Sequence, residues 1–270
     1  MGADREGAGF AWQLGVWNRM AEIYPPEADA RRTPVVEQVI HRAALNPGGH
    51  VLDLGTGPGA VAERAAQVVG PNGRVVGVDI SPNMLAVARR RLAARGLTQV
   101  ILRKGRAEAI PADTGTFDVV LASLSLMYVI DRAAAAREMA RVLRPHGRFV
   151  AAVWAGPEQA DIVRFQEIAG RFAAAPPIAG VGPGALADPT PFLEQLAAVG
   201  IEARVEQETL GAHFDTFTAA WDTLAGVTTA QLAPERLQEA KAAVLAAMYP
   251  DGDGPRHFRN TAQFILGRLR

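Results

Sequence analysis

The chain between Gly48 and Trp154 alternates short runs of β-branched residues with longer stretches rich in Ala, Arg and Leu. Such alternation is typical of parallel strands joined by crossover helices. The short runs predict strands at residues 50–54, 74–79, 100–103, 117–122 and 148–154. The longer stretches predict helices at residues 59–69, 82–95 and 132–143. The hydrophobic pattern therefore indicates an α/β core built on a mainly parallel sheet.

Local signals at the helix ends point the same way. Ser81 followed by Pro82 is typical of a helix cap and the first helical residue after it. Gly96 and Gly147 stand where two of the predicted helices should end. The end signals and the hydrophobic pattern thus predict the same helices.

The segments on either side of this core have a different pattern. Residues 12–45 are amphipathic and predict one or two helices interrupted at Pro25 and Pro26. Beyond the core, residues 191–199 and 214–248 have a helical pattern, and residues 201–205 and 261–266 resemble strands. We therefore divide the chain into an N-terminal helical lid (1–46), a core (47–155) and a remainder of the sheet (156–270). The remainder should carry cap insertions at about 156–187 and 213–257.

Composition removes several classes of function. The 270 residues include 28 basic and 28 acidic side chains and no cysteine. A balanced charge lacks the electrostatic signature of a nucleic-acid-binding protein. The absence of cysteine excludes a disulfide scaffold, a thiolate metal site and a cysteine nucleophile, and we expect no bound metal. With no signal peptide and no long apolar stretch, we expect a cytoplasmic monomer or homodimer whose partner is a small molecule, not a membrane.

The most informative motif is a strand at residues 51–54 that runs into the glycine-rich turn of residues 55–59. Glycines let the backbone turn tightly and let a ligand approach the N–H groups at a helix N-terminus. A dinucleotide fold would fit Gly55, Gly57 and Ala60, with Asp79 as the acid at the end of the second strand. The glycine motif alone is therefore compatible with more than one cofactor.

Asp53 favours S-adenosylmethionine over a dinucleotide. We expect its carboxylate, two residues before Gly55 at the mouth of the strand, to meet water or a cationic partner, because burying it unpaired is costly. A pyrophosphate would be repelled, whereas the amino and sulfonium charges of S-adenosylmethionine would be attracted. Asp79 could then accept hydrogen bonds from the two ribose hydroxyls.

These residues resemble the class I S-adenosylmethionine-dependent methyltransferases of the small-molecule type, in the quinone-biosynthesis and secondary-metabolite branch. The matching stretches are LDLGTGPG at 52–59, GVDISPNML at 77–85, GRAEAIP at 105–111, FDVV at 117–120 and REMARVLRP at 137–145. The resemblance implies a Rossmann-like, doubly wound sheet of seven strands, with N-terminal helices and a helical cap. Its last strand, near residues 261–266, should run antiparallel.

The resemblance also implies which residues bind the cofactor. Residues of the glycine turn and the strand before it would line the methionine part, and residues after the second, third and fourth strands would hold the ribose, the adenine and the sulfonium end. The set consists of Asp53, Gly55, Thr56 and Gly57 for methionine, Asp79 for the ribose, Ile80, Arg106, Ala107 and Glu108 around the adenine, and Ser123 or Leu124 at the sulfonium. Tyr24 resembles a tyrosine that closes over the cofactor.

Arg106 departs from the family pattern, which usually has Asp at this position. A guanidinium cannot accept a hydrogen bond from the adenine amino group. Either the Ala107 N–H and apolar packing recognise the adenine, or Arg106 points away into solvent. We favour the second of these arrangements.

The acceptor side of the site has fewer signals. Methyl transfer from a sulfonium needs alignment and exclusion of water, and it needs a base only if the nucleophile is protonated. His213 and His257 lie in the expected cap and are candidate general bases. Tyr128, where relatives often have histidine, is a candidate for orienting the acceptor. Aromatic and methionine side chains outside the core favour a lipophilic or aromatic substrate.

The sequence thus predicts a methyltransferase of secondary metabolism that uses S-adenosylmethionine by in-line displacement. An alternative is an enzyme of the same fold that uses the cofactor without methyl transfer, for cyclisation or rearrangement. A more remote alternative is an NAD(P)-dependent dehydrogenase.

Overall fold

Seven strands form one sheet in the computed structural model of the chain, which describes residues 2–23, 26–230 and 232–270. Their order is β3-β2-β1-β4-β5-β7-β6. The strands are β1 (His50–Leu54), β2 (Arg74–Asp79), β3 (Val100–Lys104), β4 (Phe117–Ser123), β5 (Leu143–Trp154), β6 (Ile201–Phe214) and β7 (Arg256–Leu269). β1 to β5 pair in parallel, and β7 runs antiparallel to both β5 and β6. The predicted sheet with an antiparallel last strand is confirmed.

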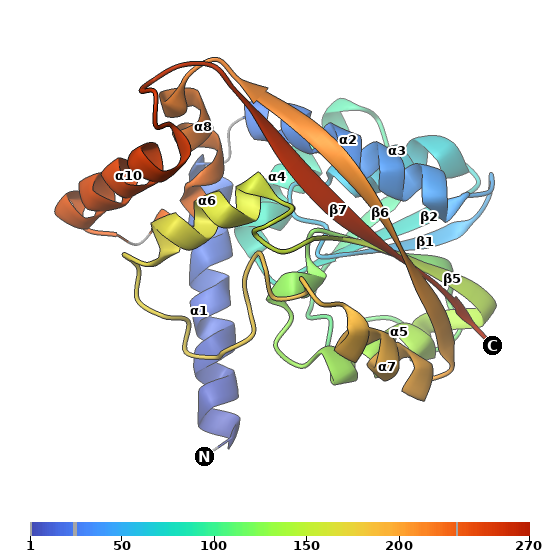
Figure 1. Cartoon of the computed structure of the whole chain (residues 1–270). Coiled ribbons are helices and arrows are strands. Elements are labelled where there is room, and N and C mark those ends of the chain that lie inside the picture. Colours follow the sequence, from blue (N-terminus) through green and yellow to red (C-terminus); the bar gives the residue numbers. More distant parts are fainter. Residues whose placement is uncertain (1, 24–25, 231) are drawn as a thin grey trace.

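The central strands are buried on both faces because helices cover both sides of the sheet. One face carries α2 (Pro26–Ala43), α3 (Ala60–Val69) and α4 (Pro82–Ala94), and the other carries α5 (Arg132–Val142) and α7 (Thr190–Ala198). Figure 1 shows α2 and α3 above the sheet and α5 and α7 below it. Strands buried on both faces are continuous apolar runs, which is why the sequence identified β1, β2 and β4 well.

The remaining helices form a layer at the carboxyl-terminal ends of the parallel strands. They are α1 (Gly2–Ile23), α6 (Asp161–Gly170), α8 (Phe217–Leu224), α9 (Gly226–Thr229) and α10 (Pro234–Met248). Figure 1 shows α6, α8 and α10 together on the left, next to α1. Aromatic side chains from this layer, among them Phe165 and Trp221, form with Phe258 of β7 a second apolar cluster separate from the main core. The layer therefore has a packed interior of its own.

Several boundaries differ from the prediction. β5, β6 and β7 are longer than expected, and the described residues of 214–248 contain three helices instead of one continuous pattern. Gly147 does not end a helix, because α5 stops at Val142 and β5 begins directly after it. A side chain on Gly147 would place its Cβ 2.8 Å from the Arg144 carbonyl oxygen, so the glycine is needed for close backbone approach.

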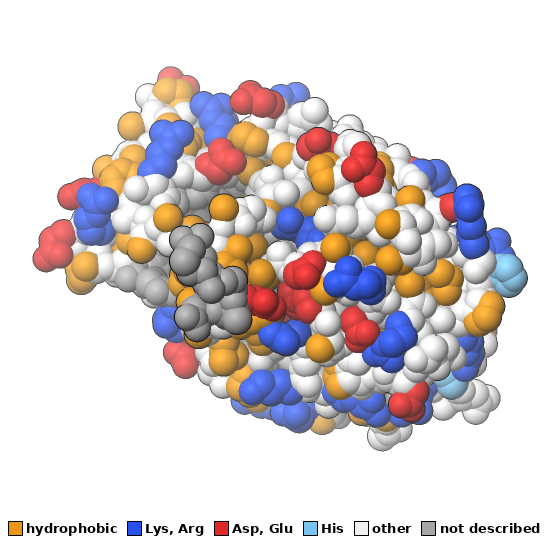
Figure 2. Space-filling model, turned by 90° about the horizontal axis from the view of Figure 1, so that it is seen from below, with side chains coloured by type: hydrophobic (Ala, Val, Ile, Leu, Met, Phe, Trp, Pro, Cys, Tyr) orange, Lys and Arg blue, Asp and Glu red, His pale blue; other side chains and the backbone are white. Residues whose placement is uncertain are grey.

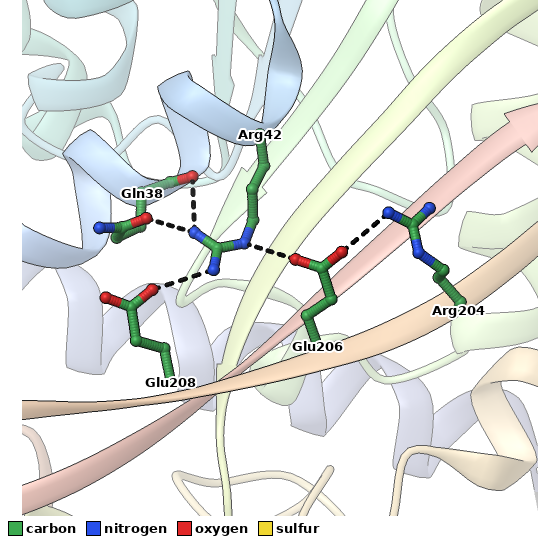
Figure 3. Close-up of polar contacts among 5 residues, drawn as sticks. All are labelled: Gln38, Arg42, Arg204, Glu206 and Glu208. Atoms are coloured by element: carbon green, nitrogen blue, oxygen red, sulfur yellow. Dashed lines mark hydrogen bonds and ion pairs between the residues drawn. The ribbon is translucent and has the colours of Figure 1, made fainter.

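Arg42 ties α2 to the edge strand β6 (Figure 3). Its guanidinium donates to Glu206 at 3.1 Å and to Glu208 at 2.9 Å, and its carbon lies 4.1 Å from the centroid of the Phe264 ring. The Arg42 side chain is only 14% exposed. Arg204, which also pairs with Glu206, is 69% exposed. Two arginines thus share one carboxylate in very different environments.

Arg42→Met should lower the free energy of unfolding by about 1–3 kcal/mol, because methionine keeps the apolar stem but leaves two partly buried carboxylates without their cation. Arg204→Met removes an exposed partner of the same Glu206 and should cost at most about 0.5 kcal/mol. Urea denaturation of both variants measures the difference. Equal losses would contradict the role given to Arg42.

The surface of the molecule agrees with the balanced composition. Figure 2 shows acidic and basic side chains interspersed over one face without separation by sign. Among the described residues, no helix has the length and apolar character needed to cross a membrane.

Candidate functional site

A cavity lies at the carboxyl-terminal edge of the parallel strands. Its floor is made by the turns that follow β1, β2, β3 and β4, and its cover comes from α1, α6 and α9. Because the ends of parallel strands meet at one edge, residues far apart in sequence come together here. Of the predicted cofactor residues, Gly55, Thr56, Gly57, Asp79, Ile80, Arg106, Ala107, Glu108 and Ser123 all line this cavity.

The glycine turn depends on backbone conformations that glycine adopts most easily. The N–H groups of Gly55 and Thr56 both donate to the Val78 carbonyl, at 2.8 and 2.9 Å, which fixes the turn against β2. Gly57 has a φ of +52°. A Cβ built on Gly57 would have only the Gly55 carbonyl oxygen nearby, at 4.0 Å, so this position faces the open space of the cavity.

Asp79 links the glycine turn to the end of β2. One carboxylate oxygen accepts the Gly57 N–H and the other accepts the Ser81 N–H, both at 2.8 Å. Burial raises the pKa of Asp79, and the hydrogen bonds from the Ser81, Gly57 and Ile80 N–H groups oppose that rise. The carboxylate is thus held rigidly on the cavity wall.

Asp53 lies elsewhere than the sequence suggested. Its side chain is 1% exposed and does not line the cavity. It accepts the Thr56 hydroxyl at 2.6 Å and the backbone N–H of Ala62 in the first turn of α3. The expectation that this carboxylate meets water or a cationic ligand was wrong, because partners within the protein compensate its burial. Burial raises the pKa of Asp53 to about 7.

That pKa gives a pH dependence of stability with a definite sign. Asp53 is held protonated in the folded chain to a higher pH than in the unfolded chain, where its pKa is about 3.9. Its ionisation therefore costs stability increasingly as the pH rises from about 4 to about 7, at up to about 1.4 kcal/mol per pH unit, and no further above. In the Asp53→Asn variant the side chain cannot ionise, so this loss of stability with rising pH is absent. Denaturation at pH 5 and pH 8 should show wild-type stability falling relative to Asp53→Asn, and parallel values would refute the assignment.

Arg106 lies at the far end of the cavity, beside Ile80 and Ala107. Its guanidinium carbon is 4.0 Å from the centroid of the Phe10 ring in α1. The expectation that Arg106 points into solvent was therefore wrong, since the side chain is half-buried and stacked. Glu108 uses one carboxylate oxygen to accept the N–H groups of Ile130 and Asp131, at 3.1 and 3.3 Å.

The opposite end of the cavity is apolar and aromatic. Ser123 is the last residue of β4 and Leu124 follows it, with a φ of +53°, which is unusual for a branched side chain. Tyr128 lies in a short 3-10 helix (Leu126–Tyr128), and its ring meets Trp17 of α1 edge to face, with 4.8 Å between centroids. Trp154 at the end of β5 also lines this end.

Several of these wall residues were not predicted from the sequence. Phe10, Gln13 and Trp17 come from α1, Trp154 from β5 and Gln166 from α6. The amphipathic pattern of residues 12–45 marked α1 as a packed helix. It carried no signal that separates residues packing in a core from residues lining a cavity.

The two candidate histidines are not brought to the cavity. His213 and His257 are partners across β6 and β7, with ring centroids 4.4 Å apart, and His213 contacts Asp215 at 3.0 Å. β6 and β7 are longer than predicted, so both residues belong to the sheet and not to the helical cap. No histidine lines the cavity in the described part of the chain. Tyr24 lies outside the described residues.

Comparison with known proteins gives the class of this domain. Residues 51–147 match the model of a methyltransferase domain. It is 40% identical to nocamycin O-methyltransferase of Saccharothrix syringae over 49% of the chain and 48% of that protein. It is 37% identical to the ubiquinone/menaquinone biosynthesis C-methyltransferase UbiE of Hahella chejuensis over 44% of the chain and 48% of that protein. The chain thus spans about half the length of each of these relatives.

The fold extends the similarity beyond the matched segment. The crystal structure of the YcgJ protein from Bacillus subtilis superposes with a TM-score of 0.65 and 21% identity, covering 87% of this chain and 97% of that one. This likeness concerns the fold. The predicted Rossmann-like architecture is confirmed.

Proposed function

We propose that the chain is an S-adenosylmethionine-dependent methyltransferase that modifies a lipophilic or aromatic small molecule. One observation carries the proposal: a single cavity is lined both by the glycine turn with Asp79 and by the aromatic side chains of Trp17, Tyr128 and Trp154. The first part suits a polar cofactor with a ribose, and the second suits an apolar acceptor. The methyltransferase domain at residues 51–147 supports the same conclusion.

The residues of the first part fit the cofactor. Gly57 leaves open space where any side chain would intrude, and the Asp79 carboxylate, held by two N–H groups, can accept hydrogen bonds from ribose hydroxyls. Ile80 offers an apolar surface beside the base. S-adenosylmethionine would supply a methyl group bonded to a positively charged sulfur.

On the acceptor side, the chain contributes alignment and exclusion of water. The carboxylates that line the cavity, Asp79 and Glu108, are both engaged with backbone N–H groups near the predicted cofactor. No histidine or lysine of the described residues lines the cavity. We therefore infer that the acceptor needs no general base from the protein to become nucleophilic. A hydroxyl of low pKa or an activated carbon meets that requirement, and the similarity to one O- and one C-methyltransferase is compatible with either.

His213→Ala and His257→Ala should therefore keep kcat/KM within about twofold of the wild type, because neither ring reaches the cavity. Tyr128→Ala should lower kcat/KM by at least about tenfold, since it removes the ring that packs against Trp17 and opens the site to water. Steady-state rates with a methyl acceptor measure all three. A loss of about 10²-fold or more in either histidine variant would restore the general-base hypothesis.

Calorimetric titration tests cofactor choice directly. The proposal predicts that S-adenosylhomocysteine binds with one-to-one stoichiometry and that S-adenosylmethionine competes with it. Tight binding of NAD(P) with no binding of S-adenosylhomocysteine would favour the dehydrogenase alternative.

We further propose that the enzyme acts in small-molecule biosynthesis in the cytoplasm, as a monomer or homodimer.

A further inference from the structure

The end of the cavity where the proposed binding mode puts the adenine is rich in hydrogen-bond donors. Lys104 and Arg106 meet Phe10 and Leu14 of α1 around a hollow that adjoins the main cavity. Neither an ammonium nor a guanidinium can accept a hydrogen bond. Glu108, a carboxylate on the same wall, uses one of its two oxygens to accept the N–H groups of Ile130 and Asp131.

We propose, on the basis of the proposed function, that this site does not read the 6-amino group of the cofactor's purine, and that Arg106 instead positions α1 over the base through Phe10. The amino group is a donor, so its recognition requires an acceptor that Arg106 cannot provide. The stacking of the Arg106 guanidinium on the Phe10 ring, at 4.0 Å, supplies the alternative role.

Because Phe10 lies in the first half of α1, its contact with Arg106 helps to hold that half of the helix in place. Farther along α1, Asn18 accepts the Ser81 hydroxyl at 2.7 Å, and its carbonyl accepts from Asn83 at 3.4 Å. Phe10 and Asn18 are eight residues apart, or about 12 Å along the helix. Gln13 and Trp17, which line the cavity, lie between them. Arg106 thus adds a contact to the half of α1 that the Asn18 contacts do not reach, where Gln13 also donates to the Tyr128 carbonyl.

Binding of two ligands tests the first part of the proposal. We expect the full chain to bind S-adenosylhomocysteine and its 6-oxo analogue S-inosylhomocysteine with dissociation constants within about threefold of each other. Arg106→Asp introduces an acceptor that favours an amino group and repels a 6-oxo group. It should shift the ratio to about tenfold or more in favour of S-adenosylhomocysteine.

A wild-type preference for S-adenosylhomocysteine above about tenfold would overturn the inference, because it would mean that a carboxylate such as Glu108 reads the amino group. An unchanged ratio in Arg106→Asp would also overturn it. If neither ligand binds, both the proposed function and this inference are wrong. If both ligands bind but their dissociation constants differ by more than about tenfold, only this inference is wrong.

Hydrogen exchange tests the positioning role without any ligand. Arg106→Gln and Phe10→Leu each remove the stacked pair, so both should raise amide exchange in the first half of α1 by about two- to fivefold. Arg90→Gln, which changes an exposed arginine on α4, should leave exchange unchanged. Both variants of the pair should weaken the two ligands by the same factor. Unchanged exchange in both variants would show that Arg106 does not position α1.

Discussion

Valine in place of Gly57 should abolish binding of S-adenosylhomocysteine while the chain still folds. The Cβ at this position meets no protein atom closer than 4.0 Å, so a branched side chain would extend into the cavity and not into the core. The φ of +52° adds backbone strain of about 1–2 kcal/mol for a residue other than glycine. Calorimetry measures the binding, and circular dichroism measures the fold.

Gly96→Val is the matched control for this substitution. Gly96 also has a positive φ, +65°, and also has no atom within 4 Å of a built Cβ, but it lies at the end of α4 away from the cavity. Its valine variant should show a similar loss of stability with unchanged affinity. Normal affinity in Gly57→Val would remove the glycine turn from the cofactor site.

Asp79→Ala should weaken binding of S-adenosylhomocysteine by about 1–3 kcal/mol, or roughly 5- to 150-fold, because charge-assisted hydrogen bonds to the ribose are lost. Asp118→Ala is a suitable control. That carboxylate also accepts a backbone N–H, from His50 at 2.8 Å, and pairs with Arg144 at 2.6 Å, but it does not line the cavity. Equal affinities for wild type and Asp79→Ala in calorimetry would exclude Asp79 from the site.

The central fold could be predicted from the sequence because buried parallel strands leave a strong pattern. β1 and β2 begin and end at the predicted residues, and Ser81 caps α4 by accepting the Met84 N–H at 3.1 Å. β6 was underestimated because many residues along this edge strand are exposed and few of them are apolar, which weakens the apolar signal. Because β6 and β7 were both predicted too short, His213 and His257 were assigned to the helical cap, although they lie in the sheet.

For the candidate site as well, the sequence predicted some features and missed others. Residues in the turns after parallel strands were found because the topology forces those turns together at one edge of the sheet. The environment of a single side chain was not accessible in this way. Asp53 is satisfied by the first turn of α3, and Arg106 stacks on a helix almost a hundred residues earlier in the chain. Both depend on tertiary contacts that no local spacing encodes.

Transfer of a labelled methyl group tests the central claim most directly. The purified chain is incubated with S-adenosylmethionine labelled in the methyl group and with phenolic, quinol and enolic acceptors, and labelled product is measured against S-adenosylhomocysteine formed. We expect one label in the product for each S-adenosylhomocysteine, with at least one acceptor class. Conversion of an acceptor while the cofactor keeps its label would contradict methyl transfer and identify a cyclisation or rearrangement on the same fold.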